Sequence, residues 1–238
     1  MRSCILVFYI ALFAASAGAQ SDPDALYRDR ADPAKAQAAT LIWQQRLETR
    51  PADFEAAWKL ARAAYWLGGH LPMAQRRAAL ERGVDAGRRA SRLEPSRPEG
   101  YFWMAADMGA LAESFGIRQG LRYRGPVKDA LETVLMIDPA YEEGSADRAL
   151  GRWYLKVPAL FGGSKTQSEA HLRKSLTYNP ESIASHFFLA ETLDAMKRTG
   201  EAAAELRRVV AAPLSAEWAP EEREFKARAE AQLRGSVQ

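Results

Sequence analysis

Beyond its first twenty residues the sequence contains no cysteine, because the single cysteine is Cys4. That absence excludes a disulfide framework, a thiol nucleophile and cysteine metal ligands. Histidine is scarce as well, since the chain has three, far apart and in no metal-binding spacing. The sequence also lacks a phosphate-binding loop and a nucleophile elbow. We therefore expect a protein that is not an enzyme and needs no metal or cofactor.

One short stretch, Gly162-Gly163-Ser164-Lys165, resembles a fragment of a phosphate loop. No strand is expected before it, and Pro158 lies a few residues upstream. A structural turn is the simpler interpretation, with Ser164 capping the helix that follows.

An excess of charge of one sign is also missing. The chain has 33 basic and 30 acidic residues, a formal net charge of +3. Nucleic-acid binding depends on a strongly basic face that releases counterions. The near balance of the two signs therefore predicts an ordinary solvated surface and no nucleic-acid partner.

The sequence lacks an N-terminal apolar run long enough to span a membrane, which takes roughly 17 residues or more. The run from Cys4 to Ala15 is shorter, and it follows the basic Arg2 and precedes Ala17-Gly18-Ala19. These features predict a secretory signal over residues 1–19, cleaved after Ala19. Cys4 lies at the start of the apolar run rather than after it, which is the wrong place for a lipid-modified cysteine. We expect a periplasmic or secreted protein, soluble after cleavage, with a flexible segment over 20–31 and a repeat domain over 32–238.

A helical hairpin repeat is present between Pro180 and Pro213. Its first half places apolar residues at intervals of three and four, as on one face of a helix. Thr199-Gly200 interrupts that pattern, a second helical pattern follows, and Pro213 lies just beyond its end. The spacing of 33 residues between the two prolines is typical of tetratricopeptide (TPR) repeats, whose period is about 34 residues.

The end of this repeat recurs along the chain. A pattern of two apolar or small residues three apart, with proline two positions later, ends at Pro95, Pro139 and Pro180. The first helices carry large–small pairs at matching places, which suit close packing: Leu60-Ala61, Met104-Ala105, Leu150-Gly151 and Leu189-Ala190. The sequence therefore predicts an all-α, right-handed α–α superhelix of about four helical hairpins, with a capping helix at each end.

The two central repeats are longer than the last one, and the extra residues fall at 112–126 and 156–166. Insertions in repeat proteins collect on loops of one face, often the binding face. In the first, Arg118, Arg122 and Arg124 either clamp a carboxylate bidentately or form a solvated connector. In the second, the apolar run that ends at Phe161 either forms the wall of a hydrophobic cleft or covers the core.

The concave surface of a TPR superhelix is lined by residues next to the large–small pairs of the first helices. The set mixes aromatic residues, arginines and acids, which suits a peptide or an amphipathic ligand. Its members are Trp58, Arg62, Tyr65, Phe102, Ala106, Arg148, Arg152, Phe187, Glu191 and Asp194.

The segment from Asp147 to Leu189 resembles the T-component (TatT-like) proteins of TRAP transporters. The resemblance rests on Leu150-Gly151-x-x-Tyr154, the Pro158…Gly162-Gly163-Ser164 element and the helix that ends at Asn179-Pro180. It implies a periplasmic repeat protein, trimeric in some members, that partners a substrate-binding subunit and binds a hydrophobic or carboxylate ligand. The lipid-anchoring cysteine of anchored members is missing here.

Two functions follow from these patterns. An accessory protein of a solute transporter predicts an enclosed apolar cavity between Trp153 and Phe161, with arginines at its mouth. A general scaffold for protein–protein interaction predicts an open concave groove instead.

Overall fold

The structure is a computed structural model that describes residues 22–235, and every regular element in that range is helical. The expected signal over residues 1–19 lies outside the described residues. The elements, in chain order, are α1 Pro23–Arg28, α2 Pro33–Thr49, α3 Phe54–His70, α4 Met73–Leu93, α5 Pro98–Ser114, α6 Ile117–Ile137, α7 Tyr141–Lys156, the 3-10 turn η1 Ala159–Phe161, α8 Lys165–Tyr178, α9 Ile183–Ala195, α10 Thr199–Ala211 and α11 Ala219–Gly235.

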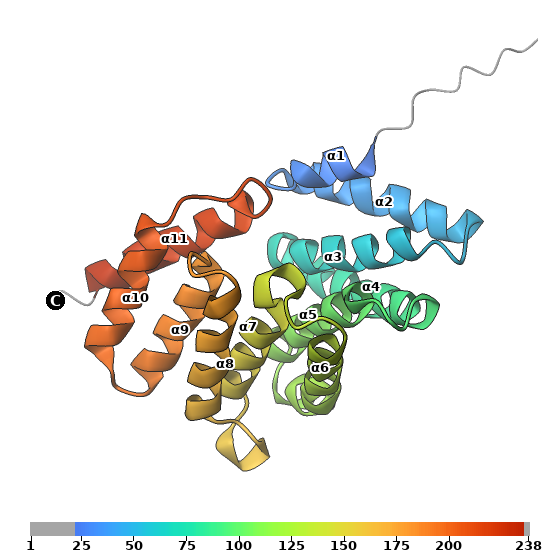
Figure 1. Ribbon diagram of the computed structural model, residues 1–238. Coiled ribbons are helices and arrows are strands. Elements are labelled where there is room, and N and C mark those ends of the chain that lie inside the picture. Colours follow the sequence, from blue (N-terminus) through green and yellow to red (C-terminus); the bar gives the residue numbers. More distant parts are fainter. Residues whose placement is uncertain (1–21, 236–238) are drawn as a thin grey trace, which may run out of the picture.

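Four antiparallel hairpins make up the body of the molecule: α3–α4, α5–α6, α7–α8 and α9–α10. They stack in chain order and curve, and the start of α11 comes back to the turn between α1 and α2 (Figure 1). This arrangement confirms the prediction of an all-α superhelix of about four hairpins with further helices at both ends.

Helix starts follow from short polar side chains at the predicted places. Asp53 and Ser182 accept hydrogen bonds from backbone N–H groups of the first turns of α3 and α9, over 2.9 and 3.3 Å. Ser164 accepts one from Gln167 N at 3.2 Å and so caps α8. The Gly-Gly-Ser-Lys stretch is therefore a helix cap, as expected from its sequence.

Small residues set how closely the helices approach. Gly151 of α7 faces Leu172 of α8, where an added Cβ would lie 2.5 Å from the Leu172 Cγ. Gly87 of α4 likewise faces Met104 of α5, with a closest distance of 2.8 Å. The large–small pair at Leu150-Gly151 thus has the packing role that the sequence predicts.

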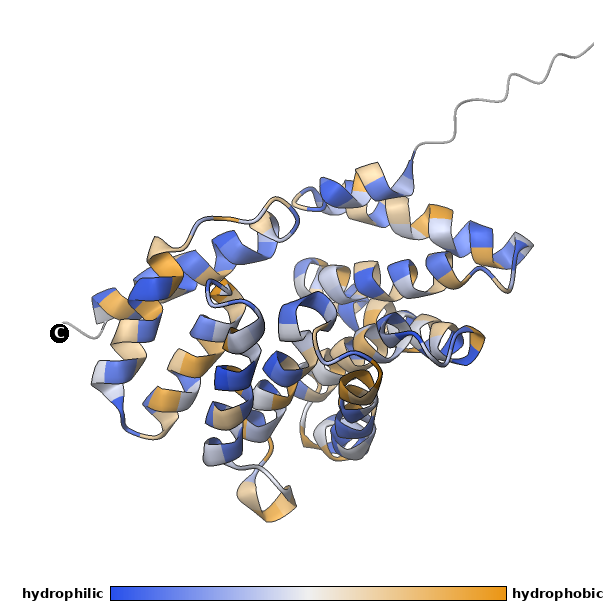
Figure 2. Ribbon diagram, viewed as in Figure 1, coloured by the Kyte–Doolittle hydropathy of each residue, from blue (hydrophilic) through white to orange (hydrophobic). Residues whose placement is uncertain are grey.

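The hydrophobic core runs between the stacked helices rather than forming one central cluster. Figure 2 shows apolar residues interleaved with polar ones along the helices, as expected for helices with one buried stripe. It also shows an apolar tip at η1, at the end of hairpin α7–α8. No helix within residues 22–235 is both long and apolar enough to cross a membrane.

The start of α7 departs from regular helix. Glu142, Glu143 and Gly144 all have positive φ, at 47°, 56° and 76°. Pro139 precedes Leu150 by eleven residues, whereas Pro180 precedes Leu189 by nine. The left-handed turn accommodates this difference, at an energetic cost for the two glutamates.

Two segments that the sequence did not place in helices are largely helical. Within the segment expected to be flexible, residues 23–28 form α1, because Asp22 caps the helix and Tyr27 is buried. The extra residues at 112–126 do not form a loop either. Gly116, with φ of 83°, makes a short turn, and the rest lengthens α5 and α6.

Candidate functional site

A row of alternating charges runs along the first helices of three consecutive hairpins and ends on α11. Arg152 of α7 donates to the Glu113 carboxylate of α5 over 2.5 and 2.8 Å, and to Glu191 of α9 over 3.4 Å. Arg228 of α11 reaches the other oxygen of Glu191 at 3.3 Å. Burial alone would lower the pKa of Arg152, but the hydrogen bonds to Glu113 raise it. We call these four residues the charge row.

Beside the charge row lies a cation without an ion-pair partner within residues 22–235. Arg148, one turn before Arg152 on α7, is half-buried. Burial lowers the pKa of Arg148, and the carboxylates of Glu142 and Glu143 oppose that shift. Tyr65 of α3, another residue that the repeat register places on the concave surface, is 43% exposed. Arg148 and Tyr65 therefore present hydrogen-bond donors to the concave surface.

The glutamate at the left-handed turn belongs to the same region. Burial raises the pKa of Glu142, and the nearby Glu217 carboxylate adds to the shift. The positive φ at Glu142 thus places an acid close to Arg62 and Arg148, both of which oppose the shift.

At the other end of the concave surface, the C-terminal part of the chain meets the N-terminal helices through Arg30. This guanidinium, 2% exposed, donates to the Glu221 carboxylate over 2.6 and 2.8 Å and to the Glu217 carbonyl at 2.5 Å. It also lies 4.9 to 5.6 Å from the ring centroids of three aromatic residues: Tyr27, Trp66 and Trp218. Burial alone would lower the pKa of Arg30, but the hydrogen bonds to Glu221 raise it.

Further contacts join the same segment to α3 and α5. The Glu217 carboxylate lies 3.6 Å from Arg62, and that of Glu224 lies 2.6 Å from Nε2 of His70. The ring of Trp218 stacks against Trp103 at a centroid distance of 6.3 Å. We call residues 213–224 the clasp segment. It covers part of the concave surface that the sequence predicted to be open.

The predicted concave residues occupy this region with different exposures. Tyr65, Arg148, Arg152 and Glu191 are accessible or half-buried. Arg62 is buried, at 8% exposure, under Asp24 and Glu217. Three other aromatic residues have packing roles: Trp58 lies against Arg62, Phe102 against Trp103 and Tyr141, and Phe187 against Phe225.

Phe187 was expected to line the groove, but it is fully buried. The reason is that α11 packs over α9 and places Phe225 5.1 Å and the Arg228 guanidinium 4.4 Å from the Phe187 ring. Phe187 therefore contributes to the core under α11.

The arginines of the central insertion lie away from the charge row, on α6. Arg118 and Arg122 are exposed, and Arg122 lies over the Tyr123 ring at 5.1 Å. Arg124 lies over the Phe161 ring at 5.2 Å, and its carbonyl accepts from Trp153 Nε1 at 2.9 Å. Because Arg122 and Arg124 are held against different rings, the three arginines do not form the carboxylate clamp that the sequence suggested. Phe161 covers Arg124 at the edge of the stack.

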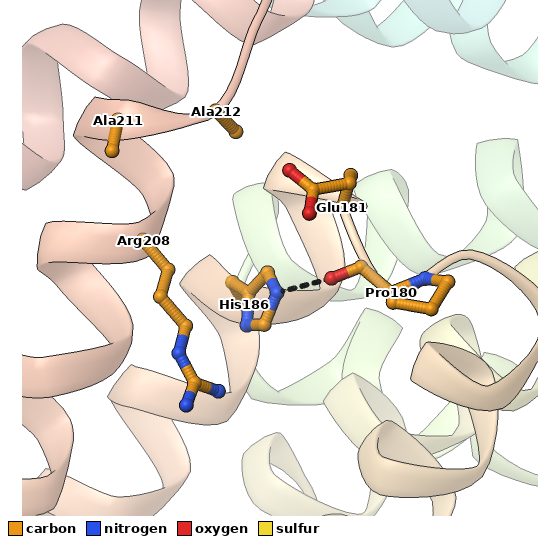
Figure 3. Close-up of a pocket in the computed structure, with 6 residues that line it drawn as sticks. All are labelled: Pro180, Glu181, His186, Arg208, Ala211 and Ala212. Carbon is orange, nitrogen blue, oxygen red and sulfur yellow. Dashed lines mark hydrogen bonds between the residues drawn. The ribbon is translucent and has the colours of Figure 1, made fainter.

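Pockets on the described residues include two that lie elsewhere. The first, of about 340 Å³, is lined by Pro180, Glu181, His186, Arg208, Ala211 and Ala212 (Figure 3). The His186 ring is held between Glu205 Oε2 at 2.5 Å and the Pro180 carbonyl at 2.8 Å, so both ring nitrogens already have partners. The second is lined by Gln45, Arg46, Thr49 and Arg50. Neither pocket touches the segment from Trp153 to Phe161, and no three potential metal ligands cluster within residues 22–235.

Sequence reasoning missed the residues that join the two ends of the chain. Arg30 lies in the segment expected to be flexible, Glu221 lies in the C-terminal helix expected to be a polar cap, and Trp218 lies just before that helix. Trp218 carried a signal that could have been used, because a lone tryptophan in a strongly charged stretch needs a partner surface.

Residues 21–236 match the family model described as "Regulator of microtubule dynamics protein 1-3". Among curated protein sequences none matches the chain significantly.

Solved structures with a similar fold include TTC0263, a thermophilic TPR protein of Thermus thermophilus, at 21% identity and a TM-score of 0.67, over 89% of this chain and 97% of that one. A crystal structure of MamA is similar at 14% identity and a TM-score of 0.50, over 84% and 95% of the two chains. A MamA RS-1 double mutant is similar at 15% identity and a TM-score of 0.51, over 90% of this chain and 99% of that one. These likenesses show a TPR-like helical repeat fold.

Proposed function

The chain belongs to the family described as regulator of microtubule dynamics protein 1-3, and we propose that it is a non-enzymatic scaffold that binds a partner protein on its concave surface. The observation that carries the proposal is Arg148, a half-buried guanidinium that makes no direct ion pair within residues 22–235. Partial burial of this charge is unfavourable in the free protein, although the Glu142 and Glu143 carboxylates offset part of the cost. A carboxylate or a backbone carbonyl of a partner would satisfy the guanidinium.

The charge row supports the same function. Its four residues come from α5, α7, α9 and α11, so a chain lying along the concave surface would meet donors and acceptors in sequence. Charged groups in such rows contribute more to partner choice and orientation than to raw affinity. Selective binding of an elongated partner segment follows from this geometry.

Photo-crosslinking tests the proposal. Tyr65 is replaced by p-benzoylphenylalanine, a bulkier aromatic side chain, in cells that express the full chain. The matched control carries the same group at Arg88, an exposed position on the second helix α4. We expect adducts with a defined partner from position 65 and none with that partner from position 88. Adducts from position 88 alone, or equal adducts from both, would contradict binding on the concave surface.

The cellular location belongs to the proposal as well. We propose that residues 1–19 direct export and that the mature chain acts in the periplasm or outside the cell. Arg2 and the Ala17-Gly18-Ala19 site support this. Intact mass spectrometry of the exported, purified protein should give the mass of a chain that begins at Gln20.

The role of an accessory protein in TRAP-type solute transport rests on the resemblance over 147–189. It requires a cavity for a hydrophobic or carboxylate ligand beside Phe161, a substrate-binding subunit as partner, and a homo-oligomer, a trimer by the same resemblance. Native mass spectrometry would show a released small molecule or a trimer if this role holds. The scaffold is the better-supported proposal, because the TPR-like fold and the charged concave surface support it directly.

The family description names microtubule dynamics. A microtubule partner requires the chain to stay in the cytosol, so it is the alternative to the exported location proposed above. Co-sedimentation with assembled microtubules at two salt concentrations addresses it directly. Binding that is lost in an Arg148→Glu variant would place a filament or a filament-associated protein on the concave surface.

A further inference from the structure

We propose that the concave surface near α3 recognises an acidic helical segment of a partner protein, and that the clasp segment occupies this surface as an internal competitor. The inference rests on the function proposed above and adds the chemistry of the partner. Three features support it: the acids and the tryptophan of the clasp segment, the residues that contact them, and the exposure of most of its ion pairs.

The clasp segment presents three acids to the N-terminal helices. Glu217 lies in the turn before α11, whereas Glu221 and Glu224 lie at the start of α11, three residues apart and so on one face of that helix. Trp218 supplies a large ring beside the first of them. Binding of such a face by a helical groove is a common mode of peptide recognition, in which residues at i, i+4 and i+7 act as anchors.

The receiving surface has one basic or aromatic partner for each of these groups. Arg62 faces Glu217, Arg30 faces Glu221 and His70 faces Glu224. Trp103 receives the ring of Trp218. Four groups of one segment are thus matched by four groups from α3, α5 and the turn before α2, so the surface is complementary in charge and shape to an acidic helix with one aromatic residue.

The clasp segment keeps its own shape through local hydrogen bonds. Ser215 Oγ accepts from Trp218 N at 3.0 Å, and the Glu222 carboxylate accepts from Ser215 N at 2.6 Å. The backbone N–H of Glu222 in turn donates to the Trp218 carbonyl at 2.9 Å. These bonds lie within the segment, so its turn does not depend on the receiving surface. Release of the segment requires the first turns of α11 to bend away from the rest of that helix, which is packed on α9.

Most of its contacts are at exposed positions, where ion pairs contribute little. The side chains of Glu217 and Glu224 are 61% and 56% exposed, and Leu214 is 40% exposed. The buried pair of Arg30 and Glu221 is the main attachment. A partner helix with the same anchors and additional contacts to Arg148 and Tyr65 would have an advantage over the clasp segment.

Fluorescence anisotropy with a labelled peptide of residues 213–224 tests this on the full chain. When a tethered segment covers the surface, the apparent affinity for a competitor equals the intrinsic affinity multiplied by the fraction of molecules in which the surface is open. Trp218→Ala in the protein weakens the internal segment only, so we expect the peptide to bind that variant about tenfold more tightly than the wild type. Leu214→Ala, which changes an exposed residue of the same segment, is the matched control and should bind as the wild type does.

A second variant keeps the test valid if Trp218→Ala lowers stability. Glu217→Gln weakens one exposed ion pair, and it should also increase peptide affinity, by a smaller factor. Circular dichroism confirms that each protein is folded at the assay temperature. A peptide with Trp replaced by Ala, or with its glutamates replaced by glutamine, should lose binding.

Three results would overturn the inference. The first is equal peptide affinity for wild type and Trp218→Ala. The second is binding that does not depend on the acids of the peptide. The third is a wild-type dimer at assay concentrations, lost in Trp218→Ala, which would assign the surface to the clasp segment of a second copy. If any of these occurs while position 65 still crosslinks to a partner, the scaffold function stands and only the acidic-helix chemistry fails.

Discussion

The contact between Arg30 and Glu221 gives the sharpest prediction about stability, because it joins residues 191 positions apart. Arg30→Met keeps most of the apolar stem and removes the guanidinium. The change leaves the Glu221 carboxylate, which is 22% exposed, and the Glu217 carbonyl without their donor. Breaking one side of a buried ion pair costs about 3–5 kcal/mol.

Since the Glu221 side of the pair is partly exposed, we expect the lower part of that range, about 3 kcal/mol. For a chain of this length each kcal/mol corresponds to roughly 2–4 °C in melting temperature. Thermal unfolding followed by circular dichroism should therefore show a decrease of about 6–12 °C. Arg88→Ala, which removes an exposed i,i+3 pair with Asp85, should change stability by less than about 1 kcal/mol.

A double-mutant cycle with Glu221→Gln isolates the pair. We expect the double variant to be about as stable as either single variant, because the first change already removes the interaction. Two results would show that Arg30 and Glu221 do not join the two ends of the chain as described. The first is a loss of stability in Arg30→Met no larger than that in Arg88→Ala. The second is additivity of Arg30→Met and Glu221→Gln.

Two other predictions concern the core. Asp107 is fully buried with no hydrogen-bond partner for its carboxylate, and burial raises its pKa well above the ordinary value. The contribution of this group to stability should therefore be most favourable below about pH 3.9, and the free energy of unfolding should fall by up to about 1.4 kcal/mol per pH unit as pH rises toward the raised pKa. Urea unfolding measured across pH should show this slope in the wild type and lose it in Asp107→Asn. Gly151→Ala forces a methyl group against Leu172 and should destabilise the chain by about 1–3 kcal/mol in the same assay, whereas Gly69→Ala, with open space around it, should stabilise it by about 0.5–1 kcal/mol. A flat pH profile in the wild type, or equal effects of the two glycine changes, would contradict these packing arguments.

The hairpins could be predicted from the sequence because helix periodicity and helix ends are local properties. The proline that follows each second helix and the large–small pairs fixed the register, and Gly151 faces Leu172 as that register requires. The left-handed turn at Glu142 could not be predicted in this way, since it depends on how two extra residues fit between packed helices.

The candidate site was only partly predictable. The repeat register predicts the members that lie on the first helices of the hairpins, such as Arg152 and Tyr65. The clasp segment does not, because its contacts with Arg30 join the two ends of the chain and no periodic pattern encodes them. For the same reason the burial of Phe187 under α11 was missed: a cap that folds back over the concave surface looks like any polar C-terminal helix in the sequence.

The most direct measurement is the affinity of the crosslinked partner for two matched charge reversals, Arg148→Glu and Arg88→Glu, by surface plasmon resonance. Both variants replace an arginine by glutamate, one on the concave surface and one on the second helix α4. We predict that Arg148→Glu weakens binding by about tenfold or more, as expected when a half-buried charge contact is reversed, while Arg88→Glu leaves the affinity within about twofold of the wild type. Equal affinities for the two variants would show that the partner does not bind at Arg148 and would contradict the assignment of the concave surface as the functional site.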